Sequence, residues 1–464
     1  MKSFLAILFL ASALKAQTVD RTKMPDTAPL APFKLPVIRE SKLPNGLTVL
    51  LVRDNRIPLV TFRLLFAGGG RLDPASQPGL AETVASLLKE GTAKRSSRQF
   101  AEDLAAIGGS LDADSGTDAL SVFGTVLSEY TSQFLDLSAD VVRNALFPQD
   151  EIDLRKENRV QELALQRSQS ATLADEKLHR VIFGNHPYAR TLPTPQSIGS
   201  IERKDLIAYR DRYLTPGNAV LVLVGDLVSE PVLLSWIRAG FGSWPQKPVP
   251  PLPGGSLPKP ARSITLIDRP GSAQIDIHLG RHTVKRLDPD YFPLVVASTI
   301  LGGGASSRLF VNIREKQGYA YDASAHHMGY RDTSLFNVST QVRDEVLEPA
   351  LHALSAELDR MGKEPVSAQE LSNMKNYLNG VFVLGLASQD GVASQLAALK
   401  TNGIPNSYLE QYVTKIRSVE PDQIQRTAAK YFSRDSNAVV IVGDASKIQK
   451  TVEKFGKVTV EKAN

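Results

Sequence analysis

The side chains that most often bind metal ions are sparse in this sequence. It contains seven histidines and no cysteine, and no histidines have the H-x-x-E-H or H-E-x-x-H spacing that gathers two ligands and a glutamate on one helix face. His278 and His282 are four residues apart, but they fall at the end of an expected strand, where this spacing gives no shared helical face. His186 precedes a proline and is expected to be a structural turn residue. The sequence therefore predicts no histidine-based metal site.

A second candidate for chemistry is the glycine-rich stretch Leu301–Tyr321, LGGGASSRLFVNIREKQGYAY. It is not a phosphate loop, because no Gly-Lys-Ser/Thr follows its glycines. The pattern instead predicts a helix end, a loop of Gly302, Gly303 and Gly304, and a second helix capped by Ser306 or Ser307. Gly318 then ends this helix and a strand begins.

These residues need a framework, and the sequence predicts the same one twice. Apolar residues at three- and four-residue spacing indicate helices, and β-branched or alternating runs indicate strands. In the first half we expect strands at Leu47–Arg53, Leu59–Ala67, Leu111–Asp114 and Ala119–Leu127, and helices at Leu80–Glu90, Arg98–Ile107, Thr131–Asn144 and Glu151–Phe183. In the second half we expect strands at Ser263–Ile267, Gln274–Leu279, Ala320–His327 and Ser334–Gln341, and a helix at Tyr291–Leu301. This order favours an α+β class, with mainly antiparallel sheets and helices packed on one face.

An internal repeat supports two homologous domains. Ser200–Tyr213 and Ser418–Tyr431 align without gaps, and each leads through a turn into an Asn-Ala-Val strand that ends in Gly-Asp. Pro245–Pro260 lies between the copies, and its seven prolines in sixteen residues predict a semi-rigid linker. The predicted division is a first domain at 43–244, a linker at 245–262, a second domain at 263–455 and a tail at 456–464.

The helix-like stretch Gly79–Thr92, GLAETVASLLKEGT, resembles the signature helix of the M16 metallopeptidases, the insulinase and mitochondrial-processing-peptidase family. In that family the helix carries H-x-x-E-H, whose histidines bind zinc and whose glutamate activates a water molecule. The resemblance implies that Glu82, Ala85 and Ser86 replace the first histidine, the glutamate and the second histidine. Glu162 lies about where the family places a third zinc ligand. It is either a remnant of that ligand or a solvated residue of a helix face.

The stretch Leu301–Tyr321 resembles a second family segment, L-G-G-G-x-S-S-R-L-x-x-x-x-R-E-K-x-G-x-x-Y. The resemblance puts Arg314 and Tyr321 at the positions of an Arg/Tyr pair that, in family enzymes, hydrogen-bonds the substrate near the scissile bond. Attack of water on a peptide carbonyl builds negative charge on its oxygen, which such donors stabilise. The alternative is that Arg314 caps its helix and Tyr321 packs in a sheet. The three-glycine loop corresponds to a longer substrate-handling loop of the non-catalytic processing-peptidase subunit.

Composition and the N-terminal pattern suggest an exported protein. The chain has 464 residues, 42% of them hydrophobic and 22% charged, and its net charge is +5 without basic runs, so nucleic acid is not an expected partner. Residues 1–16 read as a signal peptide with cleavage near Ala13 or Ala16, followed by a proline-rich extended lead-in at 17–42. No stretch has the roughly 20 apolar residues of a membrane span. In a Gram-negative organism the expected compartment is the periplasm.

The resemblance implies a non-catalytic M16 subunit that has no cofactor of its own. Zinc is expected in an H-x-x-E-H-bearing paralogue, to which Arg314 and Tyr321 would contribute in trans on a peptide or unfolded polypeptide. Pairing of the chain with a second copy of itself is left open as the alternative. The alternative is a structural or peptide-binding protein similar to the core subunits of the respiratory bc1 complex. Autonomous peptidase activity at an unrecognised site is a third reading, against which the missing histidine cluster argues.

Overall fold

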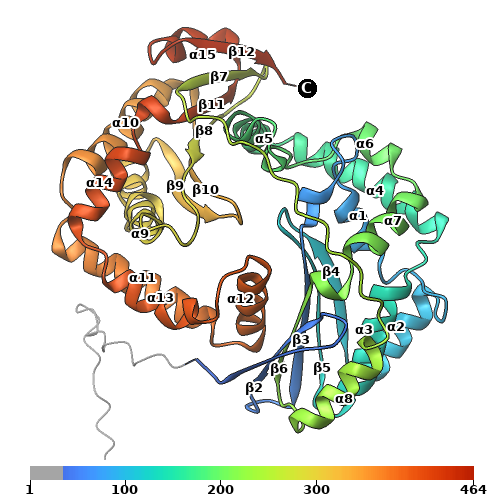
Figure 1. Cartoon of the computed structure of the whole chain (residues 1–464). Helices are drawn as coiled ribbons and strands as arrows, with labels where there is room; N and C mark the ends of the chain where they lie inside the picture. Colours follow the sequence, from blue (N-terminus) through green and yellow to red (C-terminus); the bar gives the residue numbers. More distant parts are fainter. Residues whose placement is uncertain (1–34, 464) are drawn as a thin grey trace, which may run out of the picture. The chain divides into compact units, whose positions relative to one another are not determined.

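The computed structural model describes residues 35–463, which contain two six-stranded sheets surrounded by helices (Figure 1). The predicted signal peptide at 1–16 and most of the predicted lead-in at 17–42 lie outside the described residues. None of the helices between residues 35 and 463 combines the length and the apolar character needed to cross a membrane.

The first sheet has the strand order β1-β2-β6-β3-β5-β4. The pair β2–β6 is parallel and the other neighbours are antiparallel. Its central strand β6 is buried along its whole length, as expected for a run of aliphatic residues covered on both faces. The strands are β1 (Ile38–Lys42), β2 (Thr48–Arg53), β3 (Leu59–Ala67), β4 (Ser110–Ser115), β5 (Ala119–Leu127) and β6 (Ala219–Gly225).

The second sheet repeats this arrangement in the order β12-β7-β11-β8-β10-β9. The strand β7 runs parallel to both β11 and β12, and the remaining neighbours are antiparallel. The strands are β7 (Ser263–Asp268), β8 (Ile275–His282), β9 (Ala320–Gly329), β10 (Ser334–Val342), β11 (Ala438–Gly443) and β12 (Val458–Lys462). The structure therefore confirms the predicted α+β class with two half-domains and mainly antiparallel sheets.

The helices follow the same order in both halves. The first half has α1 (Leu80–Leu87), α2 (Ser97–Ala106), α3 (Thr131–Asn144), α4 (Gln149–Arg167), α5 (Ser170–Phe183), α6 (Pro195–Ser200), α7 (Arg203–Tyr213) and α8 (Glu230–Phe241). The second half has α9 (Tyr291–Gly302), a π-helix at Phe310–Lys316, α10 (Leu347–Lys363), α11 (Ala368–Gly385), α12 (Gln389–Thr401), α13 (Ser407–Arg417), α14 (Pro421–Tyr431) and α15 (Ala445–Glu453).

Each half lends one helix to the sheet of the other half. The helix α5 packs on β8 and β11, where its apolar side chains share a buried cluster with residues of the second sheet (Figure 1). The helix α12 packs in turn on β3 and β6. The Oγ1 of Thr61 lies 3.2 Å from the Oε1 of Gln389, and Arg63 forms an ion pair with Asp390 at 2.8 Å. The sequence predicts that helices cover one face of each sheet. The structure adds to each sheet one helix that comes from the other half.

Two other sequence expectations differ from the structure, and the expected absence of helix and strand from the linker is seen in it. The helix expected at 151–183 is two helices, α4 and α5, separated at Ser168 and Gln169, so that α5 can turn onto the second sheet. The expected lead-in and tail each contribute a strand, because β1 and β12 pair with the outer strands β2 and β7. The stretch 245–262 forms neither helix nor strand, but Leu252 and Leu257 pack against buried clusters.

Candidate functional site

The helix α1 holds the predicted degenerate zinc-site positions. The carboxylate of Asp73 accepts hydrogen bonds from the backbone N–H groups of Gly79 (2.8 Å) and Ala81 (2.9 Å) and so caps this helix. Burial raises the pKa of Asp73 to about 7. Ala85 is buried among the apolar residues of the first core, and the Ser86 hydroxyl donates to a backbone carbonyl of its own helix. Neither side chain offers a metal ligand.

Glu82 and Glu162 lie close together, and two arginines of α4, rather than a metal ion, connect their carboxylates. The Nη2 of Arg155 lies 2.9 Å from the Oε1 of Glu82, and its Nη1 lies 3.0 Å from the Oε1 of Glu162. The Nε of Arg159 lies 2.8 Å from the same Glu82 oxygen, and its Nη1 lies 3.8 Å from Glu162. We call these four residues the Arg/Glu quartet. It combines two positive and two negative charges, so its net charge is zero.

The quartet does not fit a zinc ion. A zinc site needs about three protein ligands, commonly with histidine or cysteine among them, whereas these positions supply two carboxylates that are already paired with arginine. Between residues 35 and 463 no three His, Cys, Asp or Glu side chains are grouped so that they could hold a metal ion. Arg155 and Arg159 were not among the sequence candidates, although their i, i+4 spacing just before Glu162 was a usable signal.

The predicted Arg/Tyr pair forms a contact in the second half. The guanidinium of Arg314 lies 4.6 Å from the ring centre of Tyr321 and 4.6 Å from that of Phe310. Tyr321 is 83% exposed, so it does not pack inside the sheet as the alternative reading required. Arg314 also does not end a regular helix, because it lies within the π-helix, a form that occurs frequently at functional sites. An exposed phenol and a guanidinium held against it can both donate hydrogen bonds to a ligand.

Buried polar contacts hold the π-helix and were missed from the sequence. The side chain of Asn312 donates to Glu357 of α10 at 2.7 Å, and Glu357 is 3% exposed and also binds Arg360. Arg308 makes a bidentate ion pair with Glu370 of α11, with both contacts at 2.8 Å. A sequence does not show which of many glutamates faces a given helix. These contacts fix the segment that carries Arg314.

The three glycines are largely explained by packing. A Cβ on Gly302 would lie 2.1 Å from the backbone nitrogen of Ala325 in β9, and a Cβ on Gly303 would lie 2.6 Å from Thr299. Gly304 has more room, because its nearest neighbour would be the Tyr377 hydroxyl at 3.9 Å. Gly318 has a φ of +64°, as expected for the glycine that ends the segment, whereas the predicted serine cap is not seen. The role of this loop in substrate handling stays a prediction.

A buried ionic contact joins the two halves beside the linker. Arg71, which is 3% exposed, forms ion pairs with Asp118 of the first half (3.4 Å) and with Asp332 of the second half. Asp118 also accepts hydrogen bonds from the Tyr188 hydroxyl (2.9 Å) and from the backbone N–H of Arg331 (2.8 Å). We call this group the Arg71 junction. The residues of this junction are far apart in the sequence, so no local sequence pattern predicts it.

The histidines lie away from both predicted sites. His186 accepts a hydrogen bond from the Tyr188 backbone N–H, which is the structural turn role expected of it. His278 and His282 lie on β8, as expected, and His327 is partly buried on β9. In the described part of the chain, no hydrogen bond or ion pair connects a histidine with Glu82, Glu162, Arg314 or Tyr321.

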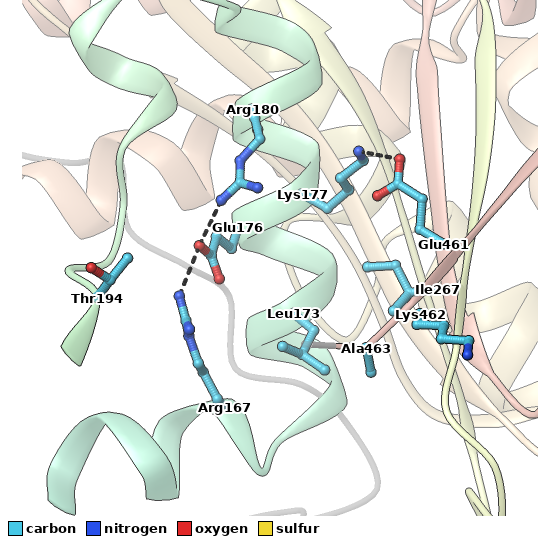
Figure 2. A pocket seen from close by; sticks show the side chains of 10 residues that line it. All are labelled: Arg167, Leu173, Glu176, Lys177, Arg180, Thr194, Ile267, Glu461, Lys462 and Ala463. Atoms are coloured by element: carbon cyan, nitrogen blue, oxygen red, sulfur yellow. Dashed lines mark hydrogen bonds and ion pairs between the residues drawn. The ribbon is translucent and has the colours of Figure 1, made fainter. Parts of the chain in front are cut away.

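A surface pocket of about 270 Å³ lies between α5 and the strands β7 and β12 (Figure 2). Figure 2 shows Arg167 and Arg180 pointing at the same carboxylate, Glu176, at 3.2 and 3.0 Å, while Lys177 binds Glu461 at 2.6 Å. Most of its charges are therefore paired with each other. Because it contains neither Arg314 nor a quartet residue, it is separate from the candidate site.

Comparison with known proteins identifies the family. Residues 48–196 match the family model described as Insulinase (Peptidase family M16), and residues 200–378 match the model described as Peptidase M16 inactive domain. Both models describe M16 proteins and together they span well over half of the chain. The chain therefore belongs to the M16 peptidase family.

Relatives and solved structures agree with this assignment. An uncharacterized zinc protease of Rickettsia felis is 26% identical over 418 residues, which covers 86% of this chain and 96% of that protein. An uncharacterized zinc protease of Mycobacterium tuberculosis is 26% identical over 428 residues, covering 91% and 97%. A crystal structure of a peptidase M16 inactive domain from Pseudomonas fluorescens has a TM-score of 0.81 and 26% identity, covering 88% and 98%.

Two further solved structures show the fold alone. A protease from Helicobacter pylori has a TM-score of 0.82 at 21% identity, covering 88% of this chain and all of that one. A chain of complex III2 from Candida albicans has a TM-score of 0.74 at 16% identity, covering 91% and 100%.

Proposed function

We propose that this protein is a non-catalytic M16 subunit that assists peptide hydrolysis by a zinc-bearing M16 partner. One contrast carries the proposal. Two of the three positions that the resemblance assigns to zinc ligands, Glu82 and Glu162, belong to the neutral Arg/Glu quartet, while Arg314 and Tyr321 in the second half form an accessible pair of hydrogen-bond donors.

The first part of the contrast supports a chain that is inactive alone. Hydrolysis by a zinc peptidase needs a metal-bound water and a base to activate it. Ala85 stands at the position of the base and has no proton acceptor, and Ser86 directs its hydroxyl to its own helix. No residue of the quartet is a free base either, because both glutamates are paired with guanidinium groups.

The second part supports a role in binding substrate. A guanidinium carries N–H donors and stays protonated, and a phenol donates one hydrogen bond near neutral pH. Both can stabilise the negative charge that develops on a peptide carbonyl during attack by water on the partner's zinc. The partner would be an H-x-x-E-H-bearing paralogue, and the N-terminal sequence pattern supports export and assembly in the periplasm of a Gram-negative cell.

The test combines the mature protein with an H-x-x-E-H-bearing M16 chain of the same organism. Hydrolysis of a fluorogenic peptide is measured for each chain alone and for the mixture, and zinc is measured per chain after mild chelation. We expect near-zero zinc in this chain and hydrolysis that requires the mixture. Arg314→Ala and Tyr321→Phe should each reduce the rate by about tenfold or more, since one such donor typically contributes 10²–10³.

Arg98→Ala and Tyr130→Phe are the controls, because they remove a guanidinium and a hydroxyl from the first half and should leave the rate unchanged. Unchanged hydrolysis with both Arg314→Ala and Tyr321→Phe would reject the role in trans. Stable assembly without hydrolysis under any pairing would favour a structural or peptide-binding protein.

A further inference from the structure

The Arg/Glu quartet occupies the place where a metal ion would connect α1 with α4. A bound zinc ion would supply positive charge and join ligands from both helices. Arg155 does both here, because its two Nη atoms contact Glu82 of α1 and Glu162 of α4 at 2.9 and 3.0 Å. One planar guanidinium therefore bridges the two carboxylates.

Arg159 makes the replacement complete. Its side chain is 8% exposed and its Nε lies 2.8 Å from the Glu82 oxygen that also contacts Arg155. An arginine cannot be deprotonated in a protein, so this positive charge is permanent. Removing Glu82 would leave this nearly buried guanidinium with only the more distant carboxylate of Glu162, at 3.8 Å, which is unfavourable.

We propose that Arg155 and Arg159 are a built-in substitute for zinc: they cross-link α1 to α4 and exclude divalent cations from the remaining carboxylates. The absence of a zinc site then has two separate causes. The histidine ligands are absent, and the oxygens that remain are committed to two fixed cations. Restoring the missing ligands alone would not restore the metal, because a zinc ion would meet two positive charges at the same place.

The experiment restores the lost motif in the full chain with and without the arginines. The triple variant Glu82→His/Ala85→Glu/Ser86→His is compared with the same variant carrying Arg155→Ala and Arg159→Ala, and zinc affinity is measured by competition with a chromophoric chelator. We expect the variant with all five substitutions to bind Zn²⁺ at least about 100-fold more tightly than the triple variant. Equal affinities would overturn the exclusion. The triple variant with Arg98→Ala is the matched control and should bind like the triple variant.

A second measurement keeps the test valid where the variants with two added histidines do not fold. The single variant Ser86→His adds one histidine to the carboxylates of Glu82 and Glu162, and its thermal unfolding is followed with and without about 1 mM ZnCl₂, both with the arginines present and in the double variant background Arg155→Ala/Arg159→Ala. We expect zinc to raise the midpoint in the double variant background only, because three protein ligands are then free to hold the ion. A midpoint that zinc leaves unchanged in the double variant background would contradict exclusion by the arginines.

The cross-linking role is tested with Glu82→Gln against Glu102→Gln, whose glutamate pairs with Arg98 on the surface of α2. The first change should lower the unfolding midpoint clearly and the second should not. Equal midpoints would contradict the cross-link. These measurements need neither a partner chain nor a peptide, so their failure is distinguishable from failure of the proposed function.

Discussion

The two halves of this protein use one framework for opposite arrangements of charge. In the first half, α1 and α4 bring two carboxylates and two guanidinium groups together and leave no net charge. In the second half, the segment after α9 holds Arg314 over an exposed tyrosine. In the function that we propose, a framework duplicated within one chain has lost a catalytic centre on one side and kept accessible ligand-binding groups on the other. The mutually paired charges of the first side would then serve stability, and Arg314 with the exposed Tyr321 would serve binding.

The largest expected effect comes from breaking the Arg71 junction, which connects the two halves of the protein. Arg71→Met leaves Asp118 and Asp332 without their buried cation, and loss of one partner of a buried ion pair typically costs about 3–5 kcal/mol. We expect urea unfolding to show a loss of this order. Arg98→Met, which removes an exposed ion pair, should cost less than about 1 kcal/mol. A similarly small loss for Arg71→Met would mean that the Arg71 junction does not hold the halves together.

The contrast itself is tested by deleting one arginine from each region. Arg314→Ala should lower the rate of hydrolysis with the partner about tenfold or more, which corresponds to an activation free energy raised by about 1.4 kcal/mol or more. The same change should alter the free energy of unfolding by less than about 0.5 kcal/mol. Arg155→Ala should do the reverse, with a loss of stability of about 1–2 kcal/mol and normal hydrolysis after assembly. Chemical unfolding and peptide hydrolysis on the same preparations check both. If both variants lost only stability, the two regions would not differ in function.

Acidification should weaken the second half through His327. Burial, with a smaller contribution from Arg286, lowers the pKa of His327 from 6.5 to about 3, and His327 lies on β9 together with Tyr321. Because the folded state holds this imidazole neutral, its contribution is fully present above pH 6.5 and is lost as pH falls below 6.5. Between pH 7.5 and pH 5 we expect a loss of about 2 kcal/mol from this group.

The measurement is urea unfolding at several pH values for the unmodified chain and for His327→Gln, in which this part of the pH dependence should disappear. His352→Gln, which changes an exposed histidine, should keep the full dependence. A pH profile unaffected by His327→Gln would contradict the prediction.

The smallest expected effect concerns the support of the π-helix. Glu357→Gln keeps the size of the side chain but weakens its contacts with Asn312 and Arg360, and we expect about 1 kcal/mol of stability to be lost. If the π-helix positions Arg314, the rate constant for hydrolysis should fall while KM stays nearly constant. Glu364→Gln alters an exposed partner of the same Arg360 and serves as the control. An unchanged rate constant for Glu357→Gln would assign Glu357 to stability alone.

The sequence predicted elements whose causes are local. The helix Thr131–Asn144 and the strands Leu59–Ala67 and Ala119–Leu127 have the expected bounds, because their apolar spacing and their flanking turns are written in neighbouring residues. Ser96 caps α2 through a local hydrogen bond with Gln99. The resemblance to the M16 family singled out Glu82 and Arg314 because each belongs to a short motif, and their assignment to site positions stays a prediction.

Contacts between distant segments were not predictable in this way. The break between α4 and α5 depends on a sheet whose first strand begins almost a hundred residues later. The pairing of Arg155 with Glu82 and of Glu357 with Asn312 depends on which faces of two helices meet. A single sequence lists the charges but does not match them, so the roles of these arginines and glutamates required the structure.

The exchanged helices α5 and α12 have a consequence for how such a chain arises and comes apart. Each sheet is complete only when the other half supplies its helix. A single half would therefore expose an apolar sheet face. An ancestor of one half in length would have needed a second copy of itself, held through these exchanged helices. The proline-rich stretch would then have joined such a pair into one chain. A protease cut at that stretch should accordingly leave two fragments that stay together.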